Sequence, residues 1–357
     1  MKNFKYFIFF SVVLLSGCLN NHSVKFTDKY QPEPNVLSNK QQITDPFVRV
    51  LGLAGIRIKD DYLQQEPNWP KAKLTLSSRR LEEINQAIQG KKDPNVSWLI
   101  NGERWQTNGI SYLNSTPIQS KAILDLILND LQFGKAMFPK QNRYTGILFL
   151  GSSLTNVRER LKFLNLCLDK YNLIFGKVYI LTGIRPLEPT IGETKESLLD
   201  PKNTIPVRQD WKPLDQLPTD EGPMIEWVFN QSRSKKIKKE QIETIYAGIG
   251  KGRQRATTRT TVEQWLKTNP KNGLYLIVSS QPFNLYQKLV VQNTLLANNR
   301  PDIKVEVIGD AFAEKSYGLK FSKDNPNGIN KYAAIALDNI ARTCYELVAL
   351  NQLSEKQ

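Results

Sequence analysis

Two serines stand where an apolar run ends, in the stretch ILFLGSSLTN over residues 147–156. A serine at such a position can attack an ester or amide when a base, normally histidine, accepts its proton. The chain contains one histidine, His22, in a polar segment near the N-terminus. Because this is the single histidine, a Ser-His-Asp triad on Ser152 or Ser153 is excluded. A Ser-Lys dyad is the remaining alternative for activating either serine.

The same stretch resembles the opening block of the GDSL-type esterases, in which a strand ends in Gly-Asp-Ser-Leu. Ser152 stands where that block has aspartate, and the later Gly-x-Asn-Asp and Asp-x-x-His blocks have no counterpart in the sequence. The resemblance therefore extends to a turn at the end of a strand and not to a triad. We expect serine-directed probes to leave Ser152 and Ser153 unlabelled.

The loop is better suited to binding an anion. Gly151 lets a ligand approach the backbone, and the N-terminus of the following helix offers free N–H groups and partial positive charge. We expect Asn156 to cap this helix, with Glu159 reaching back to it. Arg158 and Arg160 follow in the first turns, where a cation opposes the helix dipole. One of the two is therefore expected to face a ligand, and the alternative is that both are solvated.

Alternating apolar runs and helical stripes would position this loop. Four runs have the near-continuous apolar character of buried strands: 146–151, 177–183, 274–280 and 304–310. Helical stripes over 156–172 and 282–299 connect them in pairs. We therefore predict an α/β fold of Rossmann-like type, with a doubly wound, mainly parallel sheet. A last helix over 331–350 is expected to close one face of the sheet.

In such a sheet the ligand crevice lies beyond the carboxyl ends of the strands. All four predicted strands end in small or polar residues: Gly151-Ser152-Ser153, Thr182-Gly183, Ser279-Ser280-Gln281 and Gly309-Asp310. Turns also favour these residue types. We nevertheless expect the strand ends to form a binding site.

From Ile147 onward the order of these signals resembles the SanA/YdcF-like family, domain of unknown function 218, over about residues 145–300. The counterparts are Gly151 with Arg158 or Arg160, Thr182-Gly183, Asp220-Glu221, Thr261-Val262-Glu263-Gln264, and the segment 277–288 with Ser280, Gln281 and Asn284. Asn284 stands where the family has histidine, and Gln287 stands near its usual arginine. The resemblance implies a Rossmann-like pocket, with S-adenosylmethionine or a nucleotide-like ligand as candidates. For the SanA branch it also implies a role in the envelope permeability barrier.

Glu221 and Glu263 are the acidic candidates. A carboxylate in a strand-end crevice can accept a ribose or sugar hydroxyl, or act as a general base. The alternative is that both stabilise helix dipoles, an effect of about 0.3–1 kcal/mol each.

Residues 1–18 have the form of a bacterial lipoprotein signal peptide. Lys2 and Lys5 precede an apolar run that closes on Leu15-Ser16-Gly17-Cys18. The run is about half of the roughly 20 residues that a membrane-spanning helix needs. We expect lipidation of Cys18 to anchor the protein to a membrane of the bacterial cell envelope, facing the periplasm. Leu19 favours the outer membrane in a Gram-negative host, and secretion with an unmodified Cys18 is the alternative.

Three further segments are predicted between the signal peptide and the C-terminus. Residues 19–45 are polar and are expected to form a flexible tether. Residues 46–143 form a mostly helical extension, with one helix over 120–138, packed on a Rossmann-like domain over 144–350. The basic stretch 233–259 lacks the Ser or Thr that a phosphate loop needs after Lys251. It is expected to be a solvated charge run, a mobile loop over the crevice, or a contact with an anionic membrane surface.

The net charge is +15, or +13 without the two lysines of the signal peptide, which favours anionic ligands or surfaces. No nucleic-acid motif accompanies this charge, and no Cys/His cluster suits a structural metal. Cys167 and Cys344 lie in apolar stripes, where buried free thiols are favoured over a disulfide.

We therefore predict a lipid-anchored envelope protein that binds an anionic, phosphorylated or nucleotide-like small molecule. The main alternative is a non-catalytic scaffold or barrier lipoprotein with a vestigial pocket, which the residues Asn284 and Gln287 favour.

Overall fold

The computed structural model describes residues 34, 36–37, 43–56, 80–92, 97–100, 104, 116–200, 205–213, 215–249, 255–312 and 326–354. One compact unit spans Pro32–Gln357. The predicted signal peptide, Cys18 and residues 250–254 of the basic stretch lie outside the described residues. Within the described part of the chain, no helix combines the length and apolarity that a membrane span requires.

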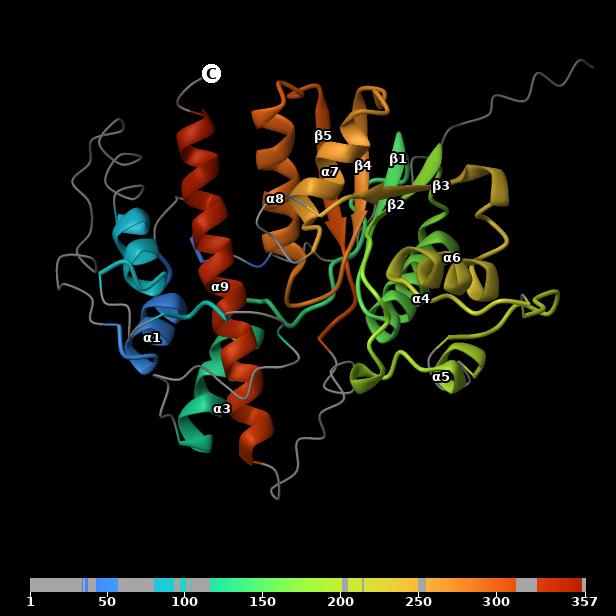
Figure 1. Ribbon diagram of the computed structural model, residues 1–357. Helices are drawn as coiled ribbons and strands as arrows, with labels where there is room; N and C mark the ends of the chain where they lie inside the picture. Colours follow the sequence, from blue (N-terminus) through green and yellow to red (C-terminus); the bar gives the residue numbers. More distant parts are fainter. Residues whose placement is uncertain are drawn as a thin grey trace, which may run out of the picture. The chain divides into compact units, whose positions relative to one another are not determined.

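Five parallel strands form the sheet (Figure 1), with the bounds β1 Gly146–Leu150, β2 Lys177–Gly183, β3 Ile242–Ala247, β4 Gly273–Val278 and β5 Ile303–Ile308. Their order is β3-β2-β1-β4-β5, and β1 pairs with both β2 and β4. The order reverses between β1 and β4, which makes that point the switch of a doubly wound sheet. The predicted α/β, Rossmann-like fold is confirmed.

Helices cover both faces of this sheet. On one face α4 (Leu154–Tyr171) packs against α6 (Glu221–Ser232), and Phe149 of β1 meets Phe229 of α6 edge to face at 4.8 Å. The opposite face holds α7 (Thr258–Leu266) and α8 (Asn284–Ala297), which pack on the other side chains of the strands. All five residues of β1 are buried, because β1 has a strand on each side and a helical layer on each face.

The edge strand β3 lies inside the basic stretch 233–259, in which no strand was predicted. Residues 242–247 pair with β2, so the alternative of a mobile loop is wrong at these positions. Only part of β3 is buried, and its side chains are mixed in polarity. The strand β3 therefore lacks the continuous apolar run by which the other four strands were predicted.

Short helical elements complete the connections at both edges of the sheet. These are η4 (Pro189–Ile191) and α5 (Lys195–Leu199) after β2, and η5 (Lys239–Gln241) before β3.

The N-terminal extension is helical, as predicted. It contains α1 (Asp45–Leu53), a helical segment over 80–88, and α3 (Pro117–Asp125), which continues as the π-helical turn η3 (Leu126–Asp130). The predicted helix over 120–138 therefore ends earlier. Phe133 folds back under η3, where its N–H donates to the carbonyl of Ile127.

The last helix, α9 (Pro326–Ser354), packs on α8 and on α3 (Figure 1). Its hydrophobic cluster joins α8 to the extension and contains no strand residue: its members include Phe47, Leu81, Ile127, Leu289 and Leu337. The helix thus covers α8 and does not close a face of the sheet directly, which corrects the expectation. Val36 and Leu37 are buried in the same cluster, so the folded part begins within the predicted tether.

Cys167 of α4 and Cys344 of α9 are both buried free thiols, and the disulfide alternative does not occur. Burial raises the pKa of Cys167 to about 12 and also raises the pKa of Cys344.

Candidate functional site

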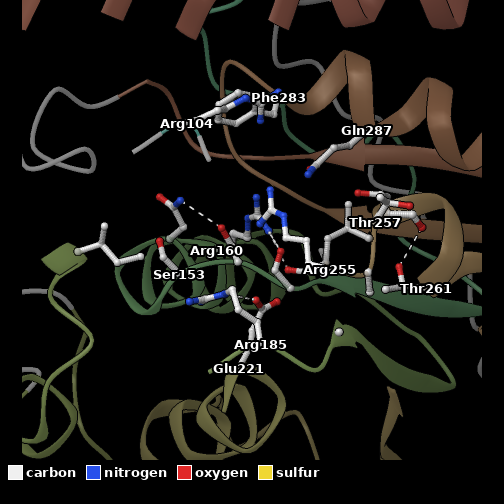
Figure 2. A pocket seen from close by; sticks show the side chains of 18 of the residues that line it. Arg104, Ser153, Arg160, Arg185, Glu221, Arg255, Thr257, Thr261, Phe283 and Gln287 are labelled. Atoms are coloured by element: carbon white, nitrogen blue, oxygen red, sulfur yellow. Dashed lines mark hydrogen bonds and ion pairs between the residues drawn. The ribbon is translucent and has the colours of Figure 1, made fainter. Parts of the chain in front are cut away.

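A cavity of about 730 Å³ opens at the carboxyl ends of the strands (Figure 2). This volume lies within the range of roughly 300–1,000 Å³ that small-molecule sites occupy. Seven of the predicted site residues line it: Gly151, Ser152, Ser153, Arg160, Gly183, Glu221 and Thr261. Two others lie behind this lining, because Thr182 contacts Glu221 and Ser280 contacts Arg160.

The start of α4 differs from the expected cap. The N-cap residue is Ser153, and the N–H of Leu154 donates to the buried carboxylate of Glu193 at 3.1 Å. Asn156 lies within the first turn, where its side chain donates to the Ser152 hydroxyl at 3.1 Å. The prediction that Asn156 caps this helix is therefore wrong. Thr155 and Asn156, the next residues of the helix, line the cavity.

Arg160 bridges the switch point of the sheet. Its Nη1 donates to the carbonyls of Leu150 and Gly151 at 2.8 and 3.0 Å, and its Nη2 donates to the Ser280 hydroxyl at 3.2 Å. One guanidinium thus ties the end of β1 to the end of β4 and brings positive charge to the cavity.

Arg158 points elsewhere. It donates to the carbonyl of Ser197 at 2.6 Å and to Gln231 at 3.4 Å, and it does not line the cavity. Burial lowers the pKa of Arg158 to about 10, an effect that Asp200 partly opposes. Of the two arginines considered for a ligand-facing role, Arg160 is the one at the cavity.

Arg185 holds two buried carboxylates together. It donates to Glu193 from both Nη atoms, at 2.7 and 2.8 Å, and from Nε to Glu221 at 2.9 Å. Burial raises the pKa of Glu221 and outweighs the opposing effect of Arg185 and Arg255. Gly151 must be glycine here, because a Cβ at that position would lie 2.5 Å from Glu221 Oε1.

Four candidates from the sequence lie away from the cavity lining: Arg158, Glu263, Gln281 and Asn284. Gln281 donates to the carbonyl of Lys135 at 2.6 Å. Asn284 is fully buried beside Gly309. A Cβ added at Gly309 would lie 2.5 Å from Asn284 Oδ1. Glu263 follows Thr261 by two residues on α7, which turns its side chain by about 200° from that face.

The sequence did not single out most of the charge around the cavity. Six lining side chains are cationic, namely Arg104, Arg160, Arg185, Arg255, Lys331 and Arg342. Among the described residues of the lining, Glu221 alone is acidic. Arg185 follows the end of β2 by two residues, so the expectation that ligands bind at the strand ends could have included it. Arg104, Lys331 and Arg342 carry no local signal, because they come from the extension and from α9.

At Ser152 the geometry of a serine nucleophile is not formed. In the part of the chain that the structure describes, the partner of the Ser152 hydroxyl is the Asn156 amide, which cannot accept a proton as a general base. Within the same described ranges, no three His, Cys, Asp or Glu side chains gather as a metal site would require.

Comparisons with family models, with curated proteins and with solved structures find no match to this chain. The geometry of the cavity is therefore the basis on which a function is assigned.

Proposed function

We propose that the cavity binds an anionic small molecule that carries a phosphate group, a nucleotide-like ligand among them. The observation that carries this proposal is that six side chains of the lining are cationic and one is a carboxylate. A concave site with this imbalance concentrates anions, and guanidinium groups bind phosphate through two parallel hydrogen bonds.

The parallel fold adds to this field. Each strand is followed by a helix, so α4, α6, α7 and α8 all begin at the edge of the sheet where the cavity lies. Helix N-termini carry partial positive charge and N–H groups without intrahelical partners. Glu193 accepts the N–H of Leu154. The backbone amides of Thr155 and Asn156 are then the donors of α4 nearest the cavity. The hydroxyls of Ser152, Ser153, Thr257 and Thr258 are further donors on the lining.

We place this binding protein on a membrane of the bacterial cell envelope, anchored by a lipid on Cys18, with a role in the permeability barrier. The form of residues 1–18 supports the anchor, and the ordered resemblance to the SanA/YdcF-like family supports the role. Mass measurement of the protein from a bacterial membrane tests the anchor: we expect the chain to begin at Cys18 and to carry acyl groups. A chain that keeps its first residues, or an unmodified Cys18, contradicts it.

The alternative is a scaffold with a vestigial pocket. Asn284 favours it, because the residue at the family's histidine position is buried beside Gly309 and cannot transfer a proton to a ligand in the cavity. The two functions differ in whether the cavity binds anything.

Ligand-induced stabilisation tests the proposal directly. The chain from Leu19 onward, which retains the unit Pro32–Gln357, is heated with phosphate, nucleotides, nucleotide sugars or S-adenosylmethionine. A ligand at about 100 times its Kd adds about 2.7 kcal/mol to the stability. We expect phosphate-bearing ligands to stabilise the protein.

Two arginine variants decide whether the cavity is responsible. Arg255 is exposed on the lining, and Arg255→Ala removes one cation there. We expect it to weaken binding by about tenfold or more, the range of a charge-assisted hydrogen bond. Arg300 pairs with Asp302 before β5, at the opposite edge of the sheet, and Arg300→Ala should leave the affinity unchanged. Equal effects of both changes, or no ligand at all, would shift the assignment to the scaffold.

A further inference from the structure

A second group of cations lies on the wall that α9 and the extension contribute to the cavity. Arg104 and Arg342 both donate from Nε to the carboxylate of Asp338, at 2.7 Å for Arg104 and at 2.9 and 3.0 Å for Arg342. The Asp338 side chain is fully buried, and it also accepts the N–H of Ile100 at 3.0 Å. One carboxylate thus orients two guanidinium groups that both line the cavity.

This arrangement leaves donors available on the cavity side. A guanidinium has five N–H groups, and a contact through Nε leaves the Nη groups for other partners. Arg342 also has a side-chain hydrogen bond with Tyr286, which lines the cavity, so part of its donor capacity is already used. The cluster of Arg104, Arg342 and Asp338 has a net charge of +1, and Lys331 on the same wall adds another positive charge. An ion pair that only joined α9 to the extension would need one arginine for this carboxylate. The second arginine, Arg342, lies one turn from Asp338 on α9 itself and therefore does not join α9 to the extension.

Arg104 is also fixed in orientation. Its guanidinium lies 4.5 Å from the ring centre of Phe283, and Phe283 itself lines the cavity. A cation stacked on an aromatic ring loses little further freedom when it binds an anion. The net pKa of Asp338 is lowered: burial alone raises it, and the neighbouring Arg104 and Arg342 outweigh this effect. The carboxylate that positions the two arginines therefore stays charged.

This wall is separate from the cations at the strand ends. Figure 2 shows Arg104 and Phe283 on one side of the cavity and Arg185 with Glu221 on the other, with Arg160 and Arg255 between them in this view. Arg160 lies in α4 and donates to the end of β1, whereas Arg104 comes from the N-terminal extension and Arg342 from α9.

We infer that the cavity has two anion subsites, one at the strand ends and one formed by Arg104, Arg342 and Lys331, and that its ligand carries two or more anionic groups. An oligophosphate, as in a nucleoside diphosphate or triphosphate, has this chemistry, and a monophosphate does not. The inference rests on the proposed function, because it divides the same cavity into two parts.

Calorimetric titration of the chain from Leu19 with inorganic phosphate and with tripolyphosphate tests it, in buffer without divalent cations. We expect the wild type to bind tripolyphosphate at least about tenfold more tightly than phosphate. Arg104→Ala and Lys331→Ala should each weaken tripolyphosphate binding by about tenfold and change phosphate binding by less than about twofold. Arg300→Ala is the matched control and should change neither.

The variants are first checked by thermal unfolding, since Arg104→Ala also removes a contact of Asp338. Lys331→Ala keeps the test valid if Arg104→Ala does not fold, because Lys331 is partly exposed on the first turns of α9. Equal loss of phosphate and tripolyphosphate affinity in these variants, or no loss of either, overturns the second subsite while leaving the proposed function intact. Failure of both probes to bind the wild type overturns the proposed function together with the inference.

Discussion

Arg185 donates to both carboxylate oxygens of Glu193, at 2.7 and 2.8 Å. Glu193 in turn accepts the N–H of Leu154, so this pair connects the segment after β2 to the first residue of α4. The remaining Nε of Arg185 reaches Glu221, the first residue of α6. One arginine therefore positions the beginnings of two helices at the edge of the cavity.

Arg185→Met should destabilise the protein strongly, because it leaves two buried carboxylates without their cation. The expected loss is about 3–5 kcal/mol of unfolding free energy near neutral pH, measured by urea denaturation. Burial raises the pKa of Glu221, and its protonation removes part of the unpaired charge, so the loss should shrink as the pH falls. Arg208→Met breaks an exposed ion pair with Asp210 and should cost little. A similar small cost for both variants would contradict a structural role of Arg185.

Glu221→Gln should change how stability depends on pH. The pKa of Glu221 is raised in the folded protein, first because the carboxyl is buried. A raised pKa contributes stability that is fully present below the ordinary value and is lost as the pH rises through the folded value. Relative to the wild type, Glu221→Gln should therefore become more stable from about pH 4.5 upward. Denaturation curves over this interval check the sign, and a relative loss of stability with rising pH would show that the pKa is lowered instead.

The same substitution should tighten anion binding. Glu221 is the acidic side chain among the described residues of the lining, and its negative charge repels a phosphate when it is ionised. Titration with inorganic phosphate at about pH 8 should give a higher affinity for Glu221→Gln than for the wild type, with less variation over pH. A lower affinity at this pH would mean that the carboxylate contacts the ligand favourably.

Arg158→Ala and Arg160→Ala should separate folding from binding. Both side chains donate to buried carbonyl groups, so each change should cost about 1–3 kcal/mol of stability in urea denaturation. Arg160 also lines the cavity, and its removal should weaken phosphate-ligand affinity by about tenfold or more. Affinities measured well below the unfolding transition should be unchanged by Arg158→Ala. If Arg158→Ala weakened ligand binding and Arg160→Ala did not, the ligand would bind outside this cavity.

Cys167 and Cys344 should be unreactive until the protein unfolds. Burial raises the pKa of both thiols, that of Cys167 to about 12, so the reactive thiolate is scarce at neutral pH. In the chain from Leu19, an aromatic disulfide reagent should detect two thiols in guanidinium chloride and none within minutes in the native protein. Fast native reaction would contradict the burial, and fewer than two thiols after unfolding would indicate oxidation.

The inner strands were predictable because a parallel strand between two helical layers is apolar on both faces. Residues 146–150 and 177–183 meet this condition and form β1 and β2. The edge strand β3 has neighbours on one side only and lies within a charged stretch, so its sequence carries a weaker signal. Rules that use local sequence also misplaced the start of α4. The amide of Leu154 finds its acceptor in Glu193, at a sequence separation of 39 residues, and no capping pattern near Asn156 contains that information.

By itself, the sequence determined the α/β fold, the crevice at the strand ends, and the absence of a histidine for a serine triad. The fold and the strand ends follow from the spacing of apolar residues within short segments. The missing histidine follows from the composition of the chain. Only the tertiary structure decided that Arg160 and not Arg158 faces the cavity, because this depends on which partners each guanidinium meets. Tertiary packing also brought Arg104 to the carboxylate of Asp338, at a sequence separation of 234 residues, whereas Arg342 pairs with it one turn along α9. The packing of α9 against α8 and the extension places this cluster on one wall of the cavity, and a contact over 234 residues leaves no pattern in any one stretch of the chain.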